Sequence, residues 1–129
     1  MTSFSGKWAL VSSDGMSNLL DALKVPAEKR PQDENATVEI DQSGDSFKVK
    51  TTTSAGARDV SFTVGTSFVD PDIKALRGKD ISVMPSWQGS KLVLTGEQGN
   101  TFTRELVGGQ MVVTLNFGGV VAKRTFNKV

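Results

Sequence analysis

Three short runs separated by paired glycines stand out in residues 100–127, NTFTRELVGGQMVVTLNFGGVVAKRTFN. Each run is rich in β-branched and aromatic residues, which favour the pleated, half-buried surface of a sheet. Glycine readily takes the positive φ that tight hairpin turns require. The pattern therefore predicts three consecutive antiparallel strands, at residues 101–107, 111–117 and 120–127.

The same punctuation continues towards the N-terminus. Glycines stand at intervals of 9 to 13 residues, at positions 44, 56, 65, 78, 89 and 99. Short strands with turn signals at such intervals are typical of an all-β sandwich or barrel, not of alternating βαβ units. Closing consecutive hairpins removes the exposed edges of a sheet, so we expect a ten-stranded antiparallel up-and-down β-barrel. The seven further strands are expected at residues 4–12, 37–41, 47–53, 60–64, 66–69, 80–84 and 91–95.

One segment departs from the strand pattern. Residues 14–23 place their apolar side chains at the spacing of one helical face, and Pro26 can start a second short helix. We therefore expect a helix-turn-helix lid over about residues 14–35. The apolar lid residues either touch a ligand inside the barrel or only pack the lid against it, and both interpretations remain open. They are Met16, Leu19, Leu20, Leu23 and Val25.

The composition excludes several classes of function. The chain of 129 residues carries 15 Lys and Arg against 14 Asp and Glu, so it lacks the basic surplus of a nucleic-acid-binding protein. It contains no Cys and no His, which excludes disulfides, thiol nucleophiles and the commonest metal ligands and general bases. Tyr is absent too. We expect a single domain over residues 1–129, with no metal, no cofactor and no catalytic activity.

Neither a membrane span nor a secretory signal is evident in the sequence. No apolar run approaches the ~20 residues that a transmembrane helix needs, and the N-terminus has no apolar signal core. We expect a cytoplasmic monomer. Lys24, Lys29 and Arg30 of the lid either dock transiently at an acidic membrane or form a solvated face, because acidic residues lie among them.

Strand periodicity places two arginines on an apolar face. Arg104 alternates with Phe102, and Arg124 alternates with Phe126, while the residues between them are mostly polar. A buried guanidinium cannot readily neutralise itself and needs an anionic partner. Two such groups that converge inside a barrel form a receptor for a carboxylate. The intervening strand is expected to add Val113, Leu115 and Phe117 to the same face.

Two alternatives stand beside this interpretation. Each arginine could point inward only to pair with an internal Asp or Glu. The strand parity could also be shifted by one residue, which would turn both side chains towards water. Periodicity alone does not decide between these possibilities.

Short segments in a fixed order along the chain carry a family resemblance. They include Phe4-x-Gly6-Lys7-Trp8, Arg104-Glu105-Leu106 and Arg124-x-Phe126-x-Lys128. Together they resemble the intracellular lipid-binding protein family, which includes fatty-acid-binding and cellular retinoid-binding proteins. The resemblance implies a calycin-like barrel with two lid helices and an interior ligand cavity. It also implies a carboxylate site at Arg104 and Arg124, with Phe126 at a position that is commonly Tyr.

The expected function is non-covalent binding and intracellular transport of a long-chain fatty acid or similar lipid carboxylate. A carrier of retinoic acid or bile acid is the alternative within the family, because these ligands also carry a carboxylate. Rivals of other classes are an enzyme on the same barrel and a barrel that acts through protein partners or lipid storage. The cavity wall is expected to include the lid residues together with Phe62, Phe102, Val113, Leu115 and Phe117.

The portal of the cavity is expected to be more open or more mobile than is usual for the family. The turn at residues 54–57 has only small side chains where the family often has a bulky aromatic one. The facing turn contributes Leu76 and Arg77, and the portal would be formed by these two residues and Ala55. This arrangement predicts rapid ligand exchange.

Overall fold

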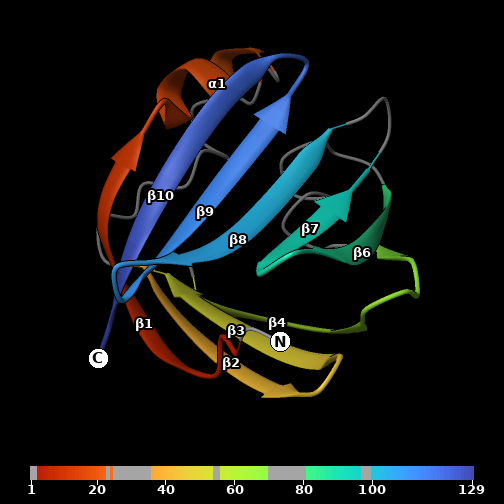
Figure 1. Ribbon diagram of the computed structural model, residues 1–129. Coiled ribbons are helices and arrows are strands. Elements are labelled where there is room, and N and C mark those ends of the chain that lie inside the picture. The colour runs from red at the N-terminus through yellow and green to blue at the C-terminus, as the bar shows by residue number, and fades with distance from the viewer. Residues whose placement is uncertain (1–2, 23, 25–35, 54–55, 70–80, 97–99) are drawn as a thin grey trace.

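Ten antiparallel strands wind into a nearly closed barrel in the computed structural model, which describes residues 3–22, 24, 36–53, 56–69, 81–96 and 100–129 (Figure 1). The elements are β1 (Gly6–Asp14), α1 (Met16–Ala22), β2 (Thr37–Ser43), β3 (Ser46–Thr53), β4 (Gly56–Thr63), β5 (Phe68–Val69), β6 (Ser82–Gln88), β7 (Lys91–Thr95), β8 (Thr101–Val107), β9 (Gln110–Phe117) and β10 (Val120–Lys128). The all-β prediction is confirmed. The bounds predicted for β7 and β8 match those of the structure.

Two strands, β4 and β6, each extend four residues past an end that the sequence pattern predicted. β4 begins at Gly56 instead of residue 60, because its polar first half pairs with β3: Thr51 lies opposite Arg58, and Lys50 lies opposite Asp59. β6 continues past Pro85 to Gln88. Proline has no N–H to donate to the ladder, but the Pro85 carbonyl accepts a hydrogen bond of 3.0 Å from the Gly65 N–H.

The sheet of this ten-stranded barrel is open at one seam. The hydrogen-bonded order is β4-β3-β2-β1-β10-β9-β8-β7-β6-β5, so β4 and β5 are its two ends. β5 has only two residues and pairs with β6. Stacked aromatic rings cross this seam: Phe62 of β4 lies 4.8 Å from Phe68 of β5 and 5.0 Å from Phe47 of β3, measured between ring centroids. Packing therefore joins the two walls where the backbone ladder does not.

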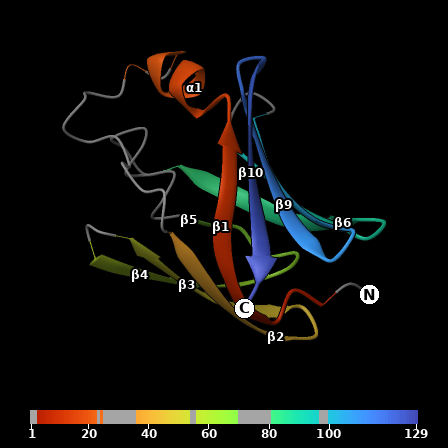
Figure 2. The same ribbon diagram turned by 90° about the vertical axis from the view of Figure 1, so that its left-hand side faces the viewer.

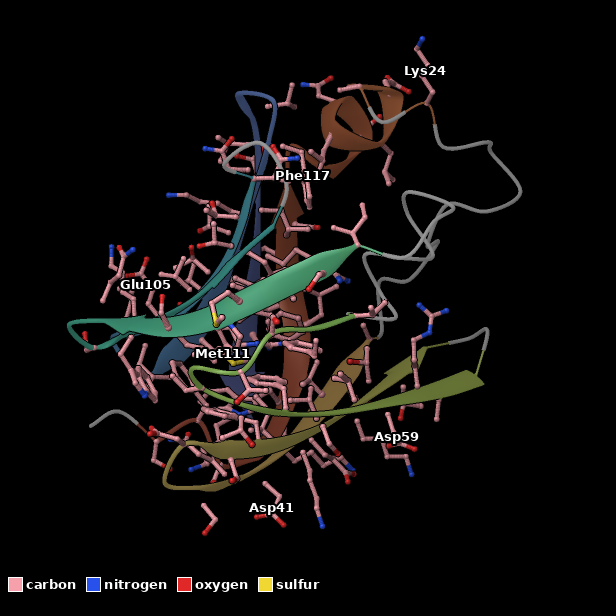
Figure 3. The ribbon with its side chains drawn as sticks, turned by 90° about the vertical axis from the view of Figure 1, so that its right-hand side faces the viewer. Lys24, Asp41, Asp59, Glu105, Met111 and Phe117 are labelled. Carbon is pink, nitrogen blue, oxygen red and sulfur yellow. The ribbon has the colours of Figure 1, made fainter. Side chains whose placement is uncertain are left out.

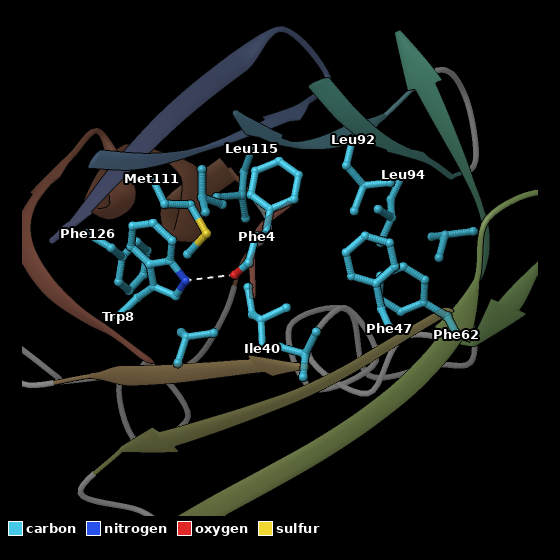
Figure 4. Close-up of a cluster of buried hydrophobic side chains, with 14 of the residues drawn as sticks. Phe4, Trp8, Ile40, Phe47, Phe62, Leu92, Leu94, Met111, Leu115 and Phe126 are labelled. Atoms are coloured by element: carbon cyan, nitrogen blue, oxygen red, sulfur yellow. Dashed lines mark hydrogen bonds between the residues drawn. The ribbon is translucent and has the colours of Figure 1, made fainter. Parts of the chain in front are cut away.

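One end of the barrel is closed by the N-terminal segment. Phe4 is fully buried and stacks on Trp87 with 6.3 Å between the ring centroids. Its carbonyl accepts a 2.9 Å hydrogen bond from the Trp8 indole N–H (Figure 4). Its own N–H donates to the Gln42 side chain. The rings of Phe4 and Trp8 both belong to the hydrophobic core.

The opposite end is covered by α1, which packs against β10 (Figure 2). Leu19 and Leu20 are buried beneath the helix, as the helical spacing predicts. α1 is shorter than the expected helix over residues 14–23, and the rest of the predicted lid lies outside the described residues. Within the described ranges, no helix has the length and apolarity to cross a membrane.

Replacing Gly15 by Ala is expected to lower the free energy of unfolding by about 1–3 kcal/mol. Gly15 joins β1 to α1 with φ at 79°, and a Cβ there would lie 2.6 Å from the Val121 carbonyl oxygen. That oxygen belongs to the backbone and cannot rotate away. Gly44→Ala is the matched control, because Gly44 also has a positive φ but has open space around it. Urea denaturation that found equal losses in the two variants would contradict the close approach.

Candidate functional site

Arg104 and Arg124 lie in one row across three neighbouring strands. Val113 of β9 pairs with Arg104 of β8 on one side and with Arg124 of β10 on the other. Residues directly opposite one another in a sheet project from the same face, so both arginines share the face of Val113. Val113 is only 3% exposed and belongs to the hydrophobic core. The sheet therefore presents two guanidinium groups to the barrel interior with one small apolar side chain between them.

An aromatic ring and a thioether lie against the guanidinium group of Arg104. The side chain is 8% exposed and lies over the Phe102 ring, 4.9 Å from the centroid. Its Nη1 lies 3.9 Å from the thioether sulfur of Met111, a weak acceptor on the adjacent strand. A π-face and a thioether both attract a cation and leave its formal charge unchanged.

Arg124 is half-buried, and its guanidinium carbon lies 5.7 Å from the centroid of the Phe126 ring. Its Nε is buried. Both arginines also take part in further interactions within the chain. Phe126 is 2% exposed and contributes a hydrophobic wall where a tyrosine would have offered a hydroxyl donor.

Charge is segregated between the two faces of the barrel wall. Four acidic residues of the described strands alternate with inward-facing residues and therefore point outward, and the fifth, Asp14, is exposed and pairs with the exposed Lys123; Asp41, Asp59 and Glu105 are labelled on the outside of the ribbon in Figure 3. Two of them pair with lysines on the same outer face, Glu105 with Lys91 at 3.5 Å and Glu39 with Lys7 at 3.9 Å. The complete set is Asp14, Glu39, Asp41, Asp59 and Glu105. The inner face thus carries positive charge, which suits an anionic guest.

Most of the predicted wall residues face the same interior. Leu115 pairs with Phe102 on the row next to the arginines, and Figure 4 shows Leu115 and Met111 pointing across the barrel towards Ile40 and Phe47. Val113, Leu115, Phe117, Phe126 and Phe62 are buried, and Phe102 is half-buried. Phe62 lies on the opposite wall, within the aromatic stack at the seam.

Several predicted residues cannot be assigned to the site. Met16 lies in α1, but its side chain is outside the described residues. The remaining lid and portal residues lie outside the described residues altogether: Leu23, Val25, Ala55, Leu76 and Arg77.

The contact between Met111 and Arg104 was not predicted from the sequence. Met111 is fully buried and pairs with Phe126 on one side and Leu106 on the other. Its alternation with Val113 and Leu115 indicates an inward side chain. The predicted strand began at Met111, however, and the orientation of a terminal strand residue is the least certain. The side-chain contact itself depends on register between two strands.

A groove of about 550 Å³ on the outer face of β1–β4 is separate from this row. Its charged lining alternates in sign across the strands, with Lys7 opposite Glu39, Glu39 opposite Lys50, and Lys50 opposite Asp59. Cross-strand pairs of opposite charge stabilise a sheet. The groove has no excess of either charge, so it offers no basis for recognising an anion.

Comparison with known proteins assigns the barrel to a family. The chain is 30% identical to fatty acid binding protein 1-B.1 of Danio rerio over 129 residues, with 98% of both chains covered. The chain belongs to the intracellular lipid-binding protein family. It is also 31% identical to cellular retinoic acid-binding protein 1 of Bos taurus over 137 residues, again with 98% of both covered.

The solved structures agree with this assignment. The structure named "REP1-NXSQ fatty acid transporter" superposes on this lipid-binding barrel with a TM-score of 0.86 and 28% identity, covering 97% of this chain and 95% of that one. No family model matches the sequence. The resemblance inferred from ordered motifs is therefore confirmed by whole-chain similarity to individual relatives.

Proposed function

We propose that this lipid-binding protein is a cytoplasmic, monomeric carrier that binds a long-chain carboxylic acid non-covalently inside its barrel. The observation that carries the proposal is the row in which Arg104 and Arg124 flank Val113 on the inner face. Guanidinium groups bind carboxylates through short, charge-assisted hydrogen bonds. The acidic residues of the described strands face outward, which leaves the inner face of these strands suited to an anionic ligand.

The two parts of such a ligand would play different roles. The head group would be oriented by the arginine pair, with Phe102 and Phe126 behind the two guanidinium groups. The tail would lie against the apolar wall and contribute most of the affinity, at about 0.8 kcal/mol for each buried methylene. Phe126 offers no hydroxyl, so direct head-group contacts would rest on the two arginines.

A fatty acid is the proposed ligand in preference to retinoic acid. One relative is named a fatty acid binding protein and the superposed structure a fatty acid transporter, whereas another relative is named for retinoic acid. Both ligands present a carboxylate, so the arginines recognise their shared chemistry. A flexible chain also adapts to an irregular wall of Leu, Val, Met and Phe side chains more readily than a rigid polyene does.

Palmitate is expected to bind at least tenfold more tightly than 1-hexadecanol, which has the same chain without the charge. A tenfold ratio corresponds to about 1.4 kcal/mol, less than a typical hydrogen bond to a charged group contributes in a buried site. Displacement of a fluorescent fatty-acid analogue from delipidated protein measures both affinities. Equal affinities would contradict the role of the arginines, and failure of the protein to bind either compound would overturn the proposed function.

A further inference from the structure

A third arginine faces the barrel interior, on the strand at the open seam. Arg58 of β4 alternates with Val60 and Phe62, both of which pack into the hydrophobic core. Its neighbour Asp59 points the other way and lines the outer groove. Because no bulge interrupts the pairing of β3 with β4, strand parity places Arg58 on the inner face.

Arg58 combines this inward direction with exposure to solvent. It is an exposed residue in the first half of β4, two positions after Gly56, where this strand begins. The pairs along this row are Trp8 with Val38, Val38 with Thr51, and Thr51 with Arg58, so the row runs from the buried core to the mouth of the barrel. Arg58 therefore lies on the inner face by strand parity and is exposed to water.

Thr51 supplies a second donor at the same place. It is half-buried and lies directly opposite Arg58. Side chains of such a pair stand about 4.5–5.5 Å apart at Cβ, close enough for the hydroxyl and the guanidinium to contact one anionic group. Arg58 has an interaction of its own within the protein, which a bound anion would join or replace.

The geometry points to a second anion subsite, formed by Arg58 and Thr51 at the mouth of the barrel, which selects ligands with an acidic group at each end. This inference rests on the proposed function, because the first acidic group is held by Arg104 and Arg124. β4 and β8 are six strands apart along the hydrogen-bonded ladder, so the two subsites lie on different parts of the barrel wall. A ligand that contacts both subsites carries its acidic groups at the two ends of a chain that crosses the interior, so the class is the long-chain α,ω-dicarboxylic acids.

The test compares hexadecanedioate with palmitate, two ligands of equal chain length that differ in one terminal carboxylate. Arg58→Gln is expected to weaken hexadecanedioate binding about fivefold, the size of a solvent-exposed charge pair, and to change palmitate binding less than twofold. Thr51→Val is expected to act in the same direction with a smaller effect. Lys50→Gln is the matched control. It also removes one positive charge, but Lys50, which precedes Thr51 in β3, lines the outer groove.

Isothermal titration at one fixed ionic strength gives the affinities. If Arg58→Gln and Lys50→Gln weaken hexadecanedioate binding equally, the effect is long-range electrostatics and the second subsite is overturned. The same holds if Arg58→Gln affects both ligands equally or neither. If the wild type binds palmitate but the selective effect is missing, the proposed function stands and only the second subsite falls. If the wild type binds neither ligand, both proposals fail.

Discussion

Replacing Arg104 by Gln is expected to lower the affinity for palmitate about a hundredfold, which corresponds to a loss of roughly 2.7 kcal/mol of binding free energy. A hydrogen bond to a charged group contributes about 1.5–3 kcal/mol, and Arg104 is only 8% exposed, so bulk water screens its charge weakly. Glutamine keeps donor hydrogens at a similar position but removes the charge. The affinity for 1-hexadecanol should therefore change little.

The measurement is fluorescent-analogue displacement with wild type, Arg104→Gln and Lys123→Gln. Lys123 is the matched control because it lies next to Arg124 on β10 but is exposed, in the alternate set opposite to the arginine. Thermal unfolding gives an independent readout. A ligand at a hundred times its dissociation constant stabilises the wild type by about 2.7 kcal/mol, and a hundredfold weaker binding reduces this to about 0.4 kcal/mol. A Gln variant that binds palmitate like wild type would show that Arg104 does not hold the head group.

Replacing Phe47 by Ala is expected to lower the free energy of unfolding by about 3–5 kcal/mol. Phe47 is 2% exposed and lies between two other aromatic rings, 5.0 Å from Phe62 and 6.1 Å from Trp87 between centroids. These contacts join β3, β4 and β6 beside the seam where β4 and β5 share no ladder. Loss of the ring leaves a cavity in the part of the wall that depends most on side-chain packing.

Urea denaturation followed by far-UV circular dichroism measures this loss without relying on the nearby Trp87. Phe47→Leu, which keeps most of the apolar volume, should cost clearly less than Phe47→Ala. Val121→Ala is the surface control and should change stability by less than about 0.5 kcal/mol, because Val121 is 45% exposed. A double-mutant cycle with Phe62→Ala should give a coupling of about 0.5–1.5 kcal/mol for the stacked pair. Losses below about 1 kcal/mol for Phe47→Ala would show that the stack does not hold the seam.

Most strands could be predicted from the sequence because their signals are local. Glycine turns mark where each strand ends, as at Gly44 and Gly89, which both have a φ near 60°. Alternation with period two then places Arg104 and Arg124 on the apolar face. The same alternation, continued from Phe62 and Val60 back to residue 58, places Arg58 on the inner face. It was not predicted because the first half of β4 is polar and lacks a strand signal of its own.

The sequence by itself determined the strand series, the helical break after β1 and the absence of Cys, His and Tyr, and it predicted an inward parity for two arginines that the strand pairing then fixed. Only the tertiary structure decided that Val113 separates these arginines in one row, that Met111 contacts Arg104, and that aromatic rings bridge the seam between β4 and β5. Side-chain parity repeats every two residues along one strand and can be read locally. Which residues of neighbouring strands lie opposite one another, and where a barrel fails to close, depend on the packing of segments far apart in the chain.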